Sequence, residues 1–244
     1  MVRARMADDI FSLVISAPGR NALSTDLMQR LLASLREAAG RPLLLSGADG
    51  AFSAGLNLKE VATLEAPAMT QFLRLLDDLI DGLYDYPGPV VACVNGHAIA
   101  GGCVLALCAD WRVAADDPAL RIGLNEVALG LEFPPKILAL ARDRVPRRHQ
   151  ERVLLEAALH DPHGARDLGL IDAVSGDAPA TARGALERLA AVPRAIYVAT
   201  KRSLRHGVLT LSEAQRRHFE QHVVPVWCAP ETKARIRAQL GRRG

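Results

Sequence analysis

Two segments of the chain join an apolar run to a turn of small residues, and each could bind a negative charge through main-chain groups. Residues 43–45 (LLL) lead to residues 52–59 (FSAGLNLK), and residues 90–94 (VVACV) lead to residues 95–103 (NGHAIAGGC). A Gly-Gly pair that opens a helix leaves free N–H groups at the positive end of the helix dipole. One N–H from each turn would form an oxyanion hole if the turns meet in space. Such turns also occur in ordinary packing, so this pattern alone leaves both interpretations open.

The familiar motifs of nucleotide, metal and serine chemistry are absent from the sequence. Neither G-x-x-x-x-G-K-[ST] nor G-x-G-x-x-G occurs, so the two common phosphate-binding loops are missing. No H-E-x-x-H and no cluster of His, Cys and Asp at ligand spacing occurs, so we predict no metal. Ser53 lies in GAFSAG, one residue longer than the G-x-S-x-G nucleophile elbow. We interpret Ser53 as a turn residue that hydrogen-bonds its neighbours.

Composition and charge narrow the class of protein. Of 244 residues, 50% are hydrophobic and 23% are charged, as in a globular protein with a sizeable core. The net charge of +3 and the 4% of aromatic residues argue against nucleic acid as a partner. Residues 90–108 carry no formal charge, but polar residues and glycines interrupt them, so we predict a strand, a turn and a helix rather than a membrane span. Four cysteines without C-x-x-C spacing and the lack of a signal-peptide pattern predict a reducing, cytoplasmic location.

Strands, turns and helices alternate in the first half of the sequence, and helices dominate the last third. This order predicts an α/β protein with a helical C-terminal part. Ser24 is the expected N-cap of the first long helix. The stretch 175–183, rich in small residues, is predicted to be a surface linker. The predicted strands are residues 10–15, 43–45, 90–94, 112–115 and 119–122.

Three segments together resemble the motifs of the crotonase superfamily, the enoyl-CoA hydratases and isomerases. Residues 52–60 are similar to the family's F-[SA]-A-G-x-D-[LI]-K-E, and residues 95–103 to its N-G-x-[AC]-x-G-G-G-x. Residues 122–130 (IGLNEVALG) resemble the motif that carries a catalytic glutamate. Residues 21–23 and 168–174 match flanking features, so the resemblance covers nearly the whole chain in the family's order.

The resemblance implies a fold, an assembly and a site. The fold would be a crotonase-like spiral of ββα units over residues 1–190, with a helical region over residues 191–244 that builds a homotrimer or a hexamer of two trimers. The partner would be an acyl-CoA thioester, and no separate cofactor would be needed because coenzyme A arrives with the substrate. The N–H groups of Leu56 and Gly101 would hold the thioester oxygen, and Glu126 would be the catalytic base. The implied substrate-binding residues are Leu56, Asn57, Leu58, Lys59 and Gly101.

One departure from the family pattern guides the choice of reaction. Hydratases of the family usually carry two glutamates, and Val104 stands where the first would be. Adding water needs one group to deprotonate it and another to help deliver a proton. A single base suits the shift of a 3-enoyl-CoA double bond to 2-enoyl-CoA in fatty acid metabolism, and Gly123-Leu124-Asn125-Glu126 resembles the mitochondrial-type isomerases. Hydration of trans-2-enoyl-CoA is the alternative, and a non-catalytic acyl-CoA-binding protein is a third hypothesis, against which the retained Glu126 argues.

Other charged and polar residues have two interpretations each. Glu132 is expected to be a solvated loop carboxylate rather than a second acid, and His97 a packed histidine rather than a ligand contact. Asn57 stands where the family often has Asp. Several C-terminal basic residues either meet the phosphates of CoA or form an ordinary solvated helix end. These are Lys233, Arg235, Arg237, Arg242 and Arg243.

Overall fold

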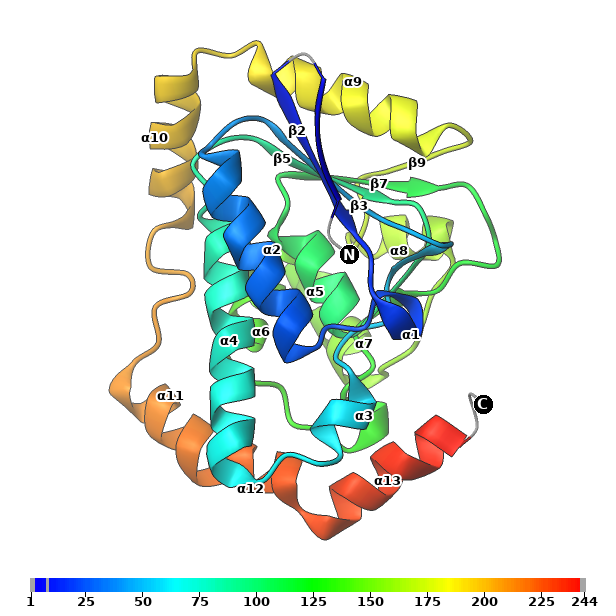
Figure 1. The fold of residues 1–244 in the computed structure, drawn as a ribbon, viewed down its shortest axis with the longest axis vertical. Helices are drawn as coiled ribbons and strands as arrows, with labels where there is room; N and C mark the ends of the chain where they lie inside the picture. Colours follow the sequence, from blue (N-terminus) through cyan, green and yellow to red (C-terminus); the bar gives the residue numbers. More distant parts are fainter. Residues whose placement is uncertain (1–2, 8, 242–244) are drawn as a thin grey trace.

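A six-stranded sheet forms the centre of the protein (Figure 1). The structure, a computed structural model, describes residues 3–7 and 9–241, so Arg242 and Arg243 lie outside the described residues. Strand β1 is antiparallel to β2, and every other neighbouring pair is parallel. In spatial order the strands are β1 (Arg3–Ala7), β2 (Ile10–Ile15), β3 (Leu43–Gly47), β5 (Val90–Val94), β7 (Trp111–Ala115) and β9 (Ala173–Ser175).

A second, smaller sheet consists of three short parallel strands. They are β4 (Ala51–Ser53), β6 (His97–Ile99) and β8 (Ile122–Gly123). Strands β3 and β4, β5 and β6, and β7 and β8 follow one another in the chain, so each pair places one strand in each sheet. A helix comes after each pair. This repeat is the ββα spiral expected from the motifs.

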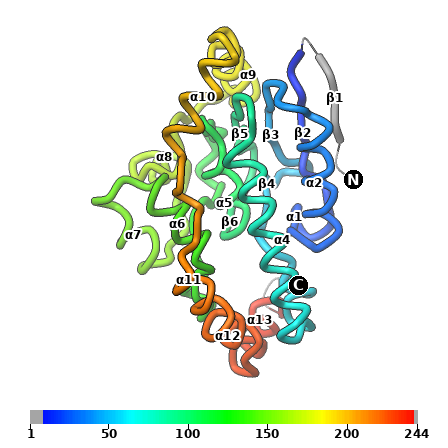
Figure 2. Tube along the Cα trace, turned by 90° about the vertical axis from the view of Figure 1, so that its left-hand side faces the viewer, coloured from blue at the N-terminus to red at the C-terminus, as the bar shows by residue number. Residues whose placement is uncertain are grey.

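Helices cover both faces of the main sheet (Figures 1 and 2). Helices α2, α4 and α5 belong to the large apolar core on one face, while α9 packs on β5 and β7 on the other. All five residues of β5 are buried because the strand is covered from both sides. The helices up to this point are α1 (Pro18–Asn21), α2 (Thr25–Ala38), α3 (Leu58–Val61), α4 (Ala66–Tyr84), α5 (Gly101–Cys108), α6 (Pro135–Arg144), α7 (Gln150–Leu155), α8 (Pro162–Asp167) and α9 (Ala178–Ala190), with short 3₁₀ turns η1 (Val127–Leu129) and η2 (Arg147–His149).

Local signals predicted several elements correctly. Strands β2 and β5 have the expected bounds, and the Ser24 side chain accepts a hydrogen bond from the Leu27 amide at the start of α2. Residues 90–108, for which we predicted a strand, a turn and a helix, form β5, β6 and α5. Within the described residues, no helix is long and apolar enough to cross a membrane.

Two predictions were wrong. Residues 119–121 are not a strand: the Leu120 amide bonds the Asp117 carbonyl in a turn, and only Ile122–Gly123 joins the small sheet. The predicted linker over 175–183 is mostly the first half of α9. The Asp177 side chain caps this helix by accepting from the Ala180 amide, and its small residues let the helix lie close to the sheet.

The C-terminal helices return to the body of the same chain (Figures 1 and 2). Helix α12 packs against α4, and α13 packs against α3. The boundary at residue 190 between a core and an oligomerisation region stays a prediction. The elements of this part are α10 (Arg194–Arg205), α11 (Glu213–His218), the π-helical turn η3 (Phe219–Val223), α12 (Val224–Cys228) and α13 (Pro230–Gly241).

Candidate active site

The three strands of the small sheet end at one edge, and each is followed by a turn that carries a predicted site residue. Leu56 follows β4, Gly101 follows β6, and Glu126 follows β8. Because the strands are parallel, their carboxyl ends meet, which is where α/β proteins commonly bind ligands. The structure brings all three residues to the wall of one cavity. The site therefore follows from strand order, not from closeness in the sequence.

The turns after β4 and β6 lie in direct contact. A Cβ added to Gly101 would stand 3.4 Å from the amide nitrogen of Leu56. At Gly55, where φ is +85°, a Cβ would stand 2.7 Å from the Ile99 carbonyl oxygen and 3.1 Å from the Gly101 nitrogen. Only glycine adopts this conformation readily and leaves room for the neighbouring chain. The two N–H groups of the predicted oxyanion hole thus belong to adjoining turns.

Ala100 turns the chain from β6 into α5 in an unusual backbone conformation. Its φ is 50° and its ψ is −120°, which costs free energy for a residue with a side chain. This turn makes Gly101 the first residue of α5, where an N–H has no carbonyl one turn earlier to bond. Strained backbone of this kind gathers at ligand-binding sites.

Buried hydrogen bonds fix the turn after β4. The Ser53 hydroxyl donates to the Asn21 carbonyl at 2.8 Å and accepts from the Gly55 amide at 3.2 Å. The Asn21 side chain in turn donates to the carbonyl oxygens of Ala48 and Ala51. Ser53 is completely buried, so its role is the structural one that we inferred from the sequence.

Glu126 is a buried carboxyl group without a charged partner among the described residues. It is 4% exposed, and its Oε2 atom is buried with no hydrogen-bond donor there. Burial raises its pKa from 4.5 to about 7, and contacts with the backbone of Glu126 and Asn125 offset part of this rise. A carboxyl group with a pKa near neutrality can both accept and release a proton under ordinary conditions.

The rest of the cavity wall is mostly apolar. Its polar members other than Glu126 are Asn125 and Trp227, and neither was predicted as a site residue. Trp227 reaches the site from α12, and its Nε1 donates to the Glu132 carbonyl at 2.9 Å. No local sequence pattern predicts that Trp227 lies in the same cavity wall as Glu126. Its position depends on how the C-terminal helices fold back onto the rest of the chain. The wall consists of Ala54, Leu56, Leu58, Leu76, Ile99, Ala100, Gly101, Asn125, Glu126, Leu129, Leu131, Ile137 and Trp227.

With this geometry in place, comparison with known proteins identifies the chain. Residues 6–233 match the family described as enoyl-CoA hydratase/isomerase. The chain belongs to this family. It is similar to enoyl-CoA delta isomerase 1, mitochondrial, of Homo sapiens, with 30% identity over 206 residues, which are 82% of this chain and 68% of that protein. It is also similar to the probable enoyl-CoA hydratase echA17 of Mycolicibacterium paratuberculosis, with 30% identity over 215 residues, 86% of this chain and 82% of that one.

Solved structures agree with the sequence comparison. The crystal structure of human mitochondrial delta3-delta2-enoyl-CoA isomerase superposes with a TM-score of 0.92 at 26% identity, covering 99% of this chain and 97% of that one. The α/β crotonase fold, with its two sheets and C-terminal helices, is therefore confirmed. This protein is an enzyme of the enoyl-CoA hydratase/isomerase family.

The three residues that follow Leu56 in the family motif have different positions and roles. Asn57 caps α3, because its Oδ1 accepts from the amides of Lys59 and Glu60. Asn and Asp are about equally good N-caps, which explains why Asn can stand where the family often has Asp. Leu58 lines the cavity, whereas the Lys59 side chain is exposed and lies outside the wall.

The two residues with open roles, Glu132 and His97, are not part of the cavity wall. Glu132 is hydrogen-bonded to the Nε2 of His218 of α11 at 2.5 Å, so it is a partly exposed loop carboxyl group with a partner. The Nδ1 of His97 accepts from the Arg121 amide at 3.0 Å, and burial together with nearby Arg20 and Arg121 lowers its pKa. A neutral, hydrogen-bonded imidazole fits the interpretation of His97 as a packed residue.

The C-terminal basic residues are not uniformly solvated. Lys233 is buried, and its Nζ bonds Glu65 at 2.6 Å, so the expectation of an exposed helix end is wrong for this residue. Arg237 donates to the Ala62 carbonyl of α3's C-cap at 3.4 Å. The guanidinium of Arg235 lies against Gly130, close to the turn that follows Glu126. These side chains fasten α13 to the active-site loops of their own chain.

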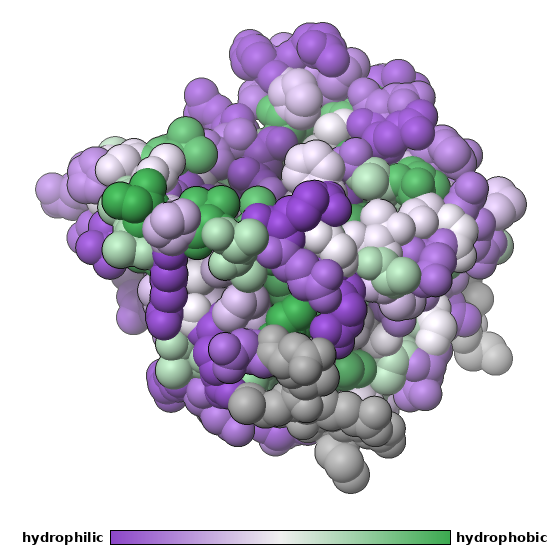
Figure 3. All heavy atoms as spheres, turned by 90° about the horizontal axis from the view of Figure 1, so that it is seen from above, coloured by the Kyte–Doolittle hydropathy of each residue, from purple (hydrophilic) through white to green (hydrophobic). Residues whose placement is uncertain are grey.

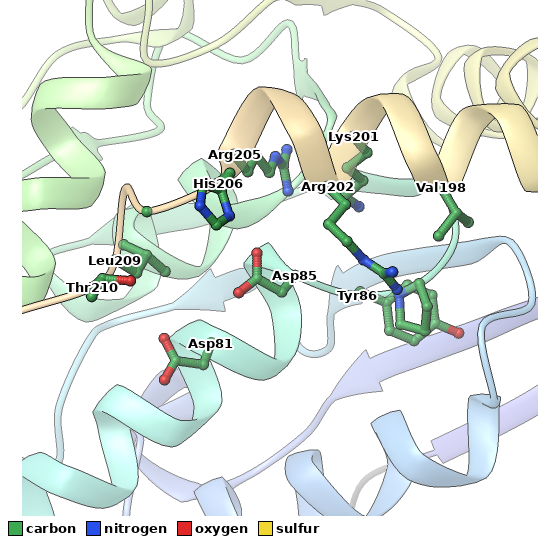
Figure 4. Close-up of a pocket in the computed structure, with 12 residues that line it drawn as sticks. Asp81, Asp85, Tyr86, Val198, Lys201, Arg202, Arg205, His206, Leu209 and Thr210 are labelled. Carbon is green, nitrogen blue, oxygen red and sulfur yellow. The ribbon is translucent and has the colours of Figure 1, made fainter.

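A second hollow, charged rather than apolar, lies between the C-terminal halves of α4 and α10 (Figure 4). Asp81 of α4 and Asp85, which follows that helix, line it from one side, and Lys201 and Arg205 of α10 line it from the other. Lys201 and Arg205 are both bound to Asp110, at 2.9 and 2.7 Å. Within the residues described, no three His, Cys, Asp or Glu side chains gather as a metal ion would require.

Proposed function

We propose that this protein isomerises 3-enoyl-CoA thioesters to 2-enoyl-CoA, with Glu126 as the one group that moves the proton. The single observation that carries the proposal is the buried Glu126 carboxyl, whose Oε2 atom is unpaired, in the cavity that Leu56 and Gly101 also line. The similarity to the human enoyl-CoA delta isomerase supports it at the level of the relative's name.

In the proposed reaction, the Glu126 carboxylate removes a proton from C2 of the acyl chain. The electron pair of that C–H bond moves toward the thioester, and the negative charge collects on its oxygen. The N–H groups of Leu56 and Gly101 stabilise this oxygen more in the enolate than in the ground state. One such donor is typically worth about 3 kcal/mol of transition-state stabilisation. Protonated Glu126 then delivers the proton to C4 and the double bond settles between C2 and C3.

Val104 supports isomerisation over hydration. Its side chain is fully buried within α5, so this position offers no second carboxyl group to the site. Water addition needs one group to activate the water and another to deliver the proton. In the allylic shift, both transfers are made by the same carboxyl group, and a pKa near 7 suits a group that must gain and lose a proton in one turnover.

The test is to incubate the purified protein with a 3-enoyl-CoA and, separately, with crotonyl-CoA. We expect turnover of the first to exceed hydration of the second. Glu126→Gln keeps the side-chain size and removes the base, so we expect isomerase turnover to fall by about 10³-fold or more. Faster hydration than isomerisation would favour a hydratase. Isomerase activity unaffected in Glu126→Gln would show that the assigned base is wrong, and absence of turnover with intact binding would favour a non-catalytic binder.

The proposed assembly is a homotrimer or a hexamer of two trimers. Apolar side chains on one side of α10 and just before it support a self-association surface: Val192, Ile196 and Leu204 are 41%, 63% and 75% exposed. The spacing of eight residues between Ile196 and Leu204 puts these two side chains on one face of α10, and Val192 lies just before the helix. Figure 3, seen from the end where α9 and α10 lie, shows apolar side chains gathered on the left, where α10 lies in Figure 1. Multi-angle light scattering of Ile196→Asp and Leu204→Asp would then report smaller species than the wild type.

A further inference from the structure

The wall of the active-site cavity is partly exposed around the oxyanion turns and buried at its apolar end. Leu56, Leu58 and Ala100 are partly exposed, so this side of the cavity is open to a ligand. Four apolar side chains of the wall are instead between 1% and 4% exposed and come from other elements. These four residues, which we call the closed end of the cavity, are Leu76 of α4, Leu131 of the loop after η1, Ile137 of α6 and Trp227 of α12.

Trp227 is the largest side chain of the closed end, and its position is fixed. Its Nε1 atom donates to the Glu132 carbonyl at 2.9 Å. Helix α12 packs against α4, and the next helix, α13, is held by the pair of Lys233 with Glu65 at 2.6 Å. Trp227 therefore cannot leave the cavity without breaking contacts that hold the C-terminal helices to the rest of the chain.

The space in front of the closed end is small. The cavity has a volume of about 30 Å³. A water-sized group occupies about 10–15 Å³ of such a volume, so about two or three groups of this size fit. That number corresponds to the carbons C2 to C4 of an acyl chain whose thioester oxygen is held by the amides of Leu56 and Gly101.

A longer acyl chain would meet the closed end. Protein interiors are densely packed, and forcing further methylene groups into them displaces side chains at a cost in free energy. We propose that Trp227 is a specificity-determining residue that limits the acyl chain to about four carbons, so that the substrate class is short-chain 3-enoyl-CoA thioesters. This inference rests on the proposed function in placing the thioester oxygen at the two amides.

Isothermal titration calorimetry tests the limit without any turnover, because saturated acyl thioesters bind but do not react. The ligands are butyryl-CoA, hexanoyl-CoA and octanoyl-CoA, and the proteins are the wild type, Trp227→Leu and a control, Cys228→Ala. Cys228 is the neighbouring residue of α12 and is partly buried, but it does not belong to the cavity wall. The control therefore reports a general disturbance of α12 without enlarging the cavity.

In a cavity with room to spare, each further buried CH₂ group would strengthen binding about fourfold. We expect the opposite order in the wild type, with octanoyl-CoA bound about tenfold or more weakly than butyryl-CoA. Trp227→Leu should bind octanoyl-CoA at least as tightly as butyryl-CoA, because the smaller side chain leaves room for the longer chain. Cys228→Ala should keep the wild-type order.

Octanoyl-CoA bound by the wild type as tightly as butyryl-CoA would overturn the inference, whether or not Trp227→Leu folds. The wild-type order in a folded Trp227→Leu, or its loss in Cys228→Ala, would also overturn it. Turnover of 3-butenoyl-CoA separates this inference from the proposed function. Isomerase turnover without a chain-length limit in binding overturns this inference alone, whereas a limit in binding without turnover overturns the proposed reaction alone.

Discussion

Glu126 is a buried acid, the side chain of Asp110 is 9% exposed, and the surroundings of the two carboxyl groups are opposite. Glu126 faces an apolar cavity with Oε2 unpaired. Asp110 accepts from the Val90 amide at 2.7 Å and binds two cationic side chains of α10, Lys201 and Arg205, beside the hollow of Figure 4. Glu126 therefore lacks the hydrogen bonds and counter-charges at Oε2 that a buried charge needs, whereas Asp110 has a backbone amide and two cationic side chains as partners.

The difference indicates a structural role for Asp110 and a functional role for Glu126. Asp110 joins α10 to the strand β5, so its charge is used in holding two parts of the fold together. Glu126 holds nothing together through Oε2, and burial drives its pKa to about 7. An unpaired buried carboxyl group with a raised pKa is a marker of a functional site, whereas a fully paired one is a marker of structure. The predictions below test whether the two residues divide in this way.

The largest effect on stability is expected at the paired acid. Asp110→Asn leaves Lys201 and Arg205 without a counter-charge, and breaking a buried pair in this way costs about 3–5 kcal/mol. Urea unfolding measures this loss. The matched control is Asp116→Asn, because the Asp116–His163 pair is about half exposed and should contribute little. Equal losses for the two variants would contradict the structural role of Asp110.

The unpaired acid should show the reverse effect, in a manner that depends on pH. The folded protein holds the Glu126 proton up to about pH 7, whereas the unfolded chain releases it near 4.5. The folded state therefore binds more protons between these values, and the wild type loses stability as pH rises from 4.5 to 7. The rise of the Glu126 pKa from 4.5 to about 7 corresponds to about 3 kcal/mol. Glu126→Gln escapes this loss, so its stability relative to the wild type should be about 3 kcal/mol higher at pH 8 than at pH 4.

Unfolding free energies of Glu126→Gln and the wild type at both pH values test this sign. A difference that does not change with pH would show that Glu126 titrates normally. The rate gives a second measurement: the ionised carboxylate is the base, so kcat/KM should increase with pH through about 7.

The smallest effect concerns strain in the backbone of the same site. Ala100 has a φ of 50° and a ψ of −120°, so Ala100→Gly should stabilise the protein by about 1 kcal/mol. Isomerase kcat should stay constant or fall, because a more flexible turn holds the Gly101 amide less firmly. Thermal unfolding together with turnover measures both effects. A loss of stability would show that the conformation of Ala100 is not strained.

Local sequence determined much of this protein, because short-range physics decides it. The covered strand β5, the Ser24 cap of α2 and the alternation of strands and helices follow from neighbours a few residues apart. The motifs also led to Leu56, Gly101 and Glu126, which the structure gathers in one cavity. Their individual roles stay predictions until the variants are measured.

Other features came from the tertiary structure, because they depend on groups far apart in the chain. Residues 175–183 have the composition of a linker, and the sheet beside them provides the surface on which they form a helix. The sequence around Lys233 is typical of a solvated helix end, but in the folded protein α13 places its Nζ atom against Glu65. Trp227 in the cavity wall and the unpaired amide of Asn125 are likewise set by folding. Sequence periodicity reports which face of a segment is apolar, but burial and pairing arise only when distant segments meet.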